Sequence, residues 1–132
     1  MTALCSFLLL ACEPAADPNA VVESWPATRK TDGGSFSVTL SPTDGDILNN
    51  KHFSLDLSVE SNKGEGPIKA EVDADMPAHG HGMNTKPELV DKGELKYQVD
   101  GMLFHMAGEW VIFIDVTRGE TTERASFPVL LE

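Results

Sequence analysis

Apolar and polar residues alternate with a period of two over much of the chain after residue 34. The alternation is clearest in five stretches: 53–59, 68–76, 95–99, 110–116 and 127–131. Because successive side chains of a β-strand point to opposite faces, each stretch predicts a strand with one buried and one solvated face. No segment shows a sustained helical period, so the pattern predicts an all-β protein.

Turn-forming residues separate these stretches, at Asp44-Gly45, Asn62-Lys63-Gly64 and Arg118-Gly119. Six or seven short strands within roughly 100 residues are typical of two packed antiparallel sheets. We therefore expect an antiparallel immunoglobulin-like β-sandwich of about seven strands, formed by residues 35–132.

The N-terminus predicts a different kind of segment. MTALCSFLLLAC is an apolar run shorter than the roughly 20 residues that a membrane-spanning helix needs. The run ends in LLAC and then turns polar, which resembles a bacterial lipoprotein signal peptide cleaved before Cys12. A hydrophobic N-terminal strand is the alternative. We expect a signal peptide over 1–11, a lipid anchor on Cys12 and a flexible tether over 12–34.

The cysteines agree with a location in the cell envelope. Cys5 falls inside the expected signal peptide and Cys12 is the expected anchor, and the sequence has no other cysteine. The mature chain would then carry no disulfide and no thiolate metal ligand. Glu13, which follows the anchor, favours sorting to the outer membrane, with the domain facing the periplasm.

The charge narrows the range of partners. The sequence has 21 acidic and 10 basic residues, a net charge of −11. A chain without a basic surface cannot displace the counterions of DNA or RNA, so nucleic acid is not expected as a partner. The acidic field mildly concentrates cations.

Soft metal ligands gather in one window of the sequence. After the start residue the methionines are Met76, Met83, Met102 and Met106, and three of the four histidines, His79, His81 and His105, lie in the same window. In an extended segment His79, His81 and Met83 would project to one side, with glycines between them. Imidazole suits several metals, whereas the thioether of methionine selects copper, especially Cu(I).

A packing interpretation stands beside the metal hypothesis. Methionine fills irregular gaps in cores. Met76 continues the apolar face of its predicted strand, and Met102, Phe104 and Met106 recur at every second position as in a core strand. His105 falls on the opposite side of that alternation, toward solvent or toward the loop. The glycine-spaced histidines are harder to explain by packing, because glycine weakens a strand.

Three motifs resemble a known family. MPAHGHGM, the segment GELKY and GMLFHMAGEWVIFIDV resemble the YtkA-like domain of bacterial envelope proteins, and are similar to the periplasmic part of FixH-type accessory proteins of cytochrome oxidase assembly. The resemblance covers residues 35–132 and implies an immunoglobulin-like sandwich with a role in copper handling. It falls on these residues: Met76, Pro77, Gly80, His81, Gly82, Phe104, Met106, Gly108 and Trp110.

In such a fold the 76–84 loop and the 104–110 segment would meet at one end of the sandwich. We therefore expect a lipid-anchored envelope protein that binds a copper ion, as a chaperone or accessory factor with a copper donor or acceptor as partner. The expected metal ligands are His79, His81, Met83, Met76, His105 and Met106.

The alternative is an envelope interaction module that binds no metal and contacts another protein through the loop. An enzyme is not expected, because the sequence lacks a Gly-x-Ser-x-Gly elbow, a phosphate-binding glycine motif and an HExxH helix. A Ser-His-Asp set needs no sequence proximity and stays open.

Overall fold

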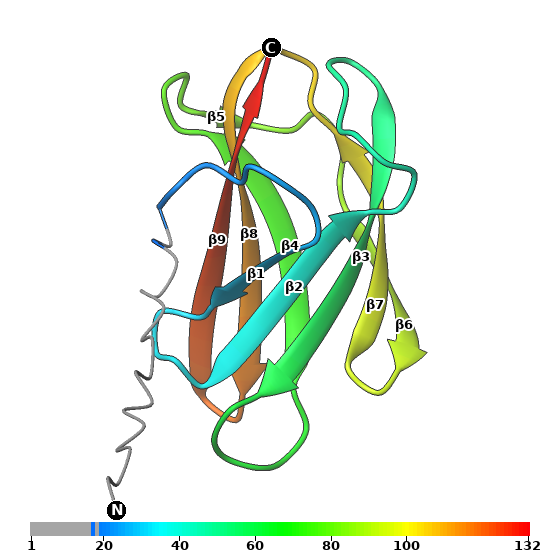
Figure 1. The fold of residues 1–132 in the computed structure, drawn as a ribbon. Helices are drawn as coiled ribbons and strands as arrows, with labels where there is room; N and C mark the ends of the chain where they lie inside the picture. Colours follow the sequence, from blue (N-terminus) through cyan, green and yellow to red (C-terminus); the bar gives the residue numbers. More distant parts are fainter. Residues whose placement is uncertain (1–16, 18) are drawn as a thin grey trace, which may run out of the picture.

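The computed structural model describes residue 17 and residues 19–132 (Figure 1). The expected signal peptide over 1–11 and the expected lipid anchor Cys12 lie outside the described residues. The described part of the chain contains strands but no helix, and hence none long and apolar enough to cross a membrane.

Within residues 19–132, nine strands form two antiparallel sheets that pack face to face (Figure 1). One sheet has the order β1-β2-β3-β7-β6 and the other β5-β4-β8-β9. The strands are β1 (Ala27–Lys30), β2 (Phe36–Pro42), β3 (His52–Ser61), β4 (Lys69–Met76), β5 (His81–Gly82), β6 (Glu88–Gly93), β7 (Lys96–Leu103), β8 (Gly108–Arg118) and β9 (Thr121–Leu131). This architecture confirms the predicted antiparallel β-sandwich.

The core lies between the two sheets and is built from the apolar side of each strand. Its largest fully buried side chains are Trp110, Phe36, Phe104, Phe127, Leu40, Leu55 and Leu57. The alternation along the sequence becomes alternating burial, most regularly in β2 and along much of β8. Three of the five stretches, 53–59, 110–116 and 127–131, lie wholly within strands, whereas Ile68 precedes β4 and Leu95 lies in the turn between β6 and β7.

The described residues form nine strands rather than about seven, partly because β1 and β5 are too short to show an alternating pattern. β1 lies within the stretch expected to be a tether and pairs with β2. Arg29 of β1 is buried and donates hydrogen bonds to the carbonyls of Asp17 and Ala20. The described residues between β1 and position 35, together with Asp17 and Ala20, are therefore part of the folded body.

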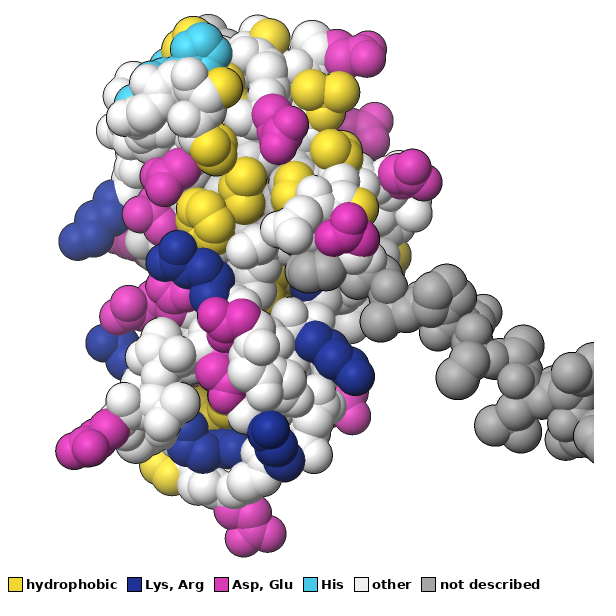
Figure 2. All heavy atoms as spheres, turned by 90° about the vertical axis from the view of Figure 1, so that its left-hand side faces the viewer, with side chains coloured by type: hydrophobic (Ala, Val, Ile, Leu, Met, Phe, Trp, Pro, Cys, Tyr) yellow, Lys and Arg dark blue, Asp and Glu magenta, His cyan; other side chains and the backbone are white. Residues whose placement is uncertain are grey.

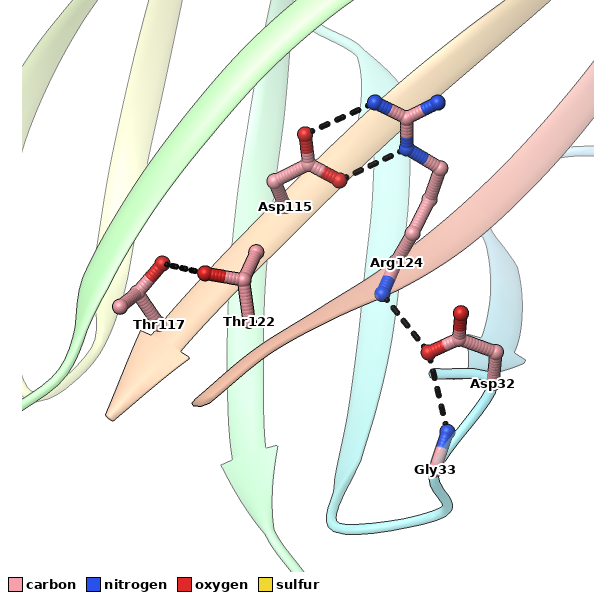
Figure 3. A network of polar contacts seen from close by, with 6 residues as sticks. All are labelled: Asp32, Gly33, Asp115, Thr117, Thr122 and Arg124. Atoms are coloured by element: carbon pink, nitrogen blue, oxygen red, sulfur yellow. Dashed lines mark hydrogen bonds and ion pairs between the residues drawn. The ribbon is translucent and has the colours of Figure 1, made fainter. Parts of the chain in front are cut away.

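Two acidic residues join the turn between β1 and β2 to strand β9. Asp32 accepts hydrogen bonds from the backbone N–H groups of Gly33 and Arg124, both at 3.0 Å (Figure 3). The buried Glu123 accepts from the hydroxyl of Thr31 at 2.7 Å and from the backbone N–H of Ser35 at 3.0 Å. These hydrogen bonds from Ser35 and Thr31 lower the pKa of Glu123 below its usual value.

Replacing Glu123 with glutamine should lower the free energy of unfolding by about 1–2 kcal/mol at neutral pH, because charge-assisted hydrogen bonds become neutral ones. A lowered folded-state pKa stabilises the fold above the ordinary glutamate pKa of about 4.3, and this stabilisation is lost as the pH falls through the folded-state value. Urea unfolding should therefore show a difference in the free energy of unfolding between the parent and Glu123→Gln proteins, and this difference should become smaller in acid. Glu120→Gln in the exposed β8–β9 turn is the control. An equal difference in unfolding free energy at neutral and acidic pH would contradict the lowered pKa of Glu123.

Candidate metal centre

A tight turn joins β4 to β5 and carries the first two histidines. The carbonyl of Met76 accepts hydrogen bonds from the backbone N–H groups of His79 at 3.1 Å and Gly80 at 3.0 Å. Proline at position 77 fixes a φ angle that suits the start of such a turn, and Gly80 adopts a φ of +65°, which favours glycine. The expected extended run from His79 to Met83 is therefore wrong at its start, because the chain turns through Gly80.

The turn folds His81 back onto the end of the core. His81 lies directly opposite Met76 in the antiparallel pair, so their side chains lie on the same face of the sheet. The Nδ1 atom of His81 is 3.0 Å from the carbonyl oxygen of Gly82. Because a carbonyl only accepts, this hydrogen bond requires the proton on Nδ1 and leaves Nε2 with the lone pair that a metal needs.

The bend between β7 and β8 supplies the third histidine. Trp110 is fully buried, stacks on Phe104 with ring centroids 4.5 Å apart, and donates its indole N–H to the carbonyl of Met106 at 2.9 Å. Gly108 has a φ of +127°, and a Cβ placed there would lie 2.9 Å from the Cε of Met76. The bend that presents His105 is therefore held by Trp110 and requires glycine at position 108.

Three imidazole rings meet at this end of the sandwich, and we call His79, His81 and His105 the histidine cluster. The ring centroids are 5.8 Å apart for His79 and His81 and 5.3 Å apart for His81 and His105. Two imidazoles that bind one ion through nitrogens at about 2 Å have centroids roughly 5 Å apart. Figure 2 shows histidine side chains gathered at one end of the molecule.

Trp110 and a buried ring nitrogen of His105 complete the surroundings of the cluster. The Trp110 indole is T-shaped to the rings of His81 and His105, which we call the inner rings. The Trp110 ring centroid lies 6.1 Å from that of His81 and 5.5 Å from that of His105. The Nδ1 atom of His105 is buried, and no hydrogen-bond partner reaches it among the described residues. A buried ring nitrogen without a partner costs about 1–3 kcal/mol, which a bound cation or an ordered water would offset.

The methionines divide between core and surface. Met76 and Met102 are fully buried, which confirms the packing interpretation for both. That interpretation is wrong for Met106, which is 36% exposed, because β7 ends at Leu103 and the chain bends before β8. Met83 packs against the core and lines a groove beside β4. Met106 is thus the accessible thioether on the segment that bears His105.

Within the described part of the chain, no three His, Cys, Asp or Glu side chains already have the spacing of a metal site. The donors that do lie together are the cluster imidazoles, with a methionine next to His105 in the chain. Two or more imidazoles with one thioether form a donor set that suits Cu(I) better than zinc or magnesium. The importance of Trp110 for orienting both inner rings was missed, because stacking partners are not visible in a linear sequence.

No known protein family, curated protein or solved structure matches this chain.

Proposed function

We propose that this chain binds a copper ion at the histidine cluster and passes it on, as a chaperone or accessory factor held at the envelope membrane through Cys12. The observation that carries the proposal is the pair His81 and His105, whose ring centroids lie 5.3 Å apart while Nδ1 of His105 is buried without a partner. A copper-handling role is also what the resemblance to the YtkA-like domain implies.

Each donor has a distinct role in this proposal. His81 is the fixed ligand, because its hydrogen bond to the Gly82 carbonyl sets both the tautomer and the ring orientation. His105 is the second nitrogen ligand, and Met106 supplies sulfur from the same bend. His79 is exposed, so it exchanges with solvent or with a ligand of the donor or acceptor protein. Cu(I) held by few soft ligands remains open to a competing ligand, which permits transfer.

Copper binding is tested by titrating the apo protein with Cu(I) against a chromophoric competing chelator. We expect about one ion per chain, and a loss of affinity of roughly 100-fold or more when His81 and His105 are both replaced by alanine. His52→Ala is the matched control, because His52 is an exposed histidine at the start of β3 and lies outside the histidine cluster. Equal uptake by the double variant, or no uptake by the parent protein, would contradict the proposal.

The same titration identifies the sulfur ligand. Met106→Leu should weaken Cu(I) binding and leave Zn(II) binding nearly unchanged, because a thioether favours the softer ion. Met83→Leu should leave both unchanged, because Met83 lines the groove beside β4. If instead Met83→Leu weakens Cu(I) binding and Met106→Leu does not, Met83 is the sulfur ligand, as the spacing of His79, His81 and Met83 predicts.

A further inference from the structure

Strand β4 has a long open edge. It pairs with β8 from Lys69 to Asp75, whereas β5 covers its other side only at Asp75 and Met76. From Lys69 to Ala74, no described strand pairs with that side of β4. An open edge presents unpaired backbone N–H and C=O groups, which can pair with another chain.

The backbone groups on this edge can be assigned. The N–H of Ala74 is bonded to the side chain of Asp73 at 2.8 Å, and a Cβ built on Gly82 of β5 would lie 3.2 Å from the carbonyl oxygen of Ala74. Both backbone polar groups of Ala74 therefore point away from β8. Because these directions alternate along a strand, the backbone groups of Ala70 and Val72 point the same way.

The edge forms one wall of a groove of about 600 Å³, and β6 with the loop before it forms the opposite wall. Half-buried apolar side chains line the groove on its inner side: Ala70, Val72, Met83 and Leu89. A strand added to β4 would place every second side chain against these residues.

The outer side of the groove is acidic. Its lining holds four carboxylates and two cations, a balance of −2: Glu71, Asp73, Asp75, Asp115, Lys86 and Arg124. Arg124 is already neutralised by two hydrogen bonds to Asp115, at 2.8 and 3.0 Å (Figure 3). Lys69 pairs with Glu71 at 2.9 Å, while Asp73 and Asp75 form no ion pair among the described residues.

We propose that the open edge of β4 binds an extended segment of a partner protein as an additional strand, and that this segment alternates apolar residues with lysine or arginine. The backbone groups of Ala70 and Val72 would pair with the segment, because those of Ala74 already face Asp73 and β5. Its apolar side chains would enter the groove, and its basic side chains would lie beside Asp73 and Asp75. This inference is independent of copper, because the groove contains no member of the histidine cluster.

The probe is a capped eight-residue peptide that alternates lysine and valine, and binding is measured by calorimetry up to 1 mM peptide. Two further peptides carry N-methyl groups on either all valine amides or all lysine amides, which blocks the donors of one peptide edge at a time. We expect saturable binding of the parent peptide and at least tenfold weaker binding of one methylated peptide only. Loss with methylated valines indicates antiparallel addition, and loss with methylated lysines indicates parallel addition.

Protein variants and hydrogen exchange locate the binding site. Asp73→Asn with Asp75→Asn should weaken binding at least several-fold, whereas Asp56→Asn with Glu60→Gln, exposed on β3 of the other sheet, should not. Bound peptide should slow amide exchange at Ala70 and Val72. Absence of saturable binding, equal binding of both methylated peptides, equal effects of the two double variants, or protection at another strand edge would each overturn the proposal.

Discussion

Replacing Trp110 with alanine is expected to lower the free energy of unfolding by about 3–5 kcal/mol, the range for removing a large aromatic from a core. Trp110 is fully buried, its ring lies nearly parallel to that of Phe104 at 8°, and its indole N–H is bonded to the carbonyl of Met106. Alanine would remove the stacking partner and leave that carbonyl without its donor. Urea denaturation of the parent and variant proteins measures the loss.

Trp110→Phe separates packing from hydrogen bonding. Phenylalanine keeps an aromatic ring against Phe104 but cannot donate to the Met106 carbonyl, so a smaller loss of about 1–2 kcal/mol is expected. The same variant should weaken Cu(I) binding, because the bend that presents His105 loses its tie to the core. A loss below 1 kcal/mol for the alanine variant would contradict the placement of Trp110.

The strands were predictable because each long strand has one buried and one solvated face. β3 shows how directly this works: Leu55, Leu57 and Val59 are buried and Asp56 and Glu60 are exposed. The pattern fails where a segment is short or where the chain turns. The two residues of β5 are too few to show a period. Met106 continues the alternation of β7 in the sequence, but β7 ends at Leu103 in the structure.

The candidate site was predictable in its parts but not in its arrangement. The nearness of His81 and His105 was expected from two loops that meet at one end of an immunoglobulin-like sandwich, and their rings do lie together. The placement of Met83 at the groove beside β4 depends on where β5 ends, after only two residues paired with β4. Trp110 contacts the rings of both His81 and His105, and no periodicity in the sequence encodes such a tertiary contact.

Asp100-Gly101 shows how a local signal can be overridden by the sheet. An aspartate followed by glycine usually indicates a turn, yet both residues lie inside β7. The register between β3 and β7 shifts here: Leu55 pairs with Val99 and Phe53 with Met102. Two residues of β7 thus face one residue of β3, which is a β-bulge, and Gly101 takes the φ of +79° that the bulge requires.

Gly101→Ala is therefore expected to destabilise the protein by about 3 kcal/mol. A left-handed φ costs a non-glycine residue about 1–2 kcal/mol, and the added Cβ would lie 2.7 Å from the carbonyl oxygen of Lys86. That oxygen belongs to backbone, so relief requires moving the loop that the Thr85 hydroxyl ties to the Gly101 carbonyl at 2.6 Å. Overpacking of this kind adds about 1–3 kcal/mol, and urea unfolding measures the sum.

Gly93→Ala is the matched control, because Gly93 has a φ of +84° and a Cβ there would meet nothing within 4 Å. It should lose only the conformational part, about 1–2 kcal/mol. The difference between the two variants then measures the contact between β7 and the loop that walls the groove beside β4. Equal losses would mean that this loop is not held against β7, and the groove would then lack its opposite wall.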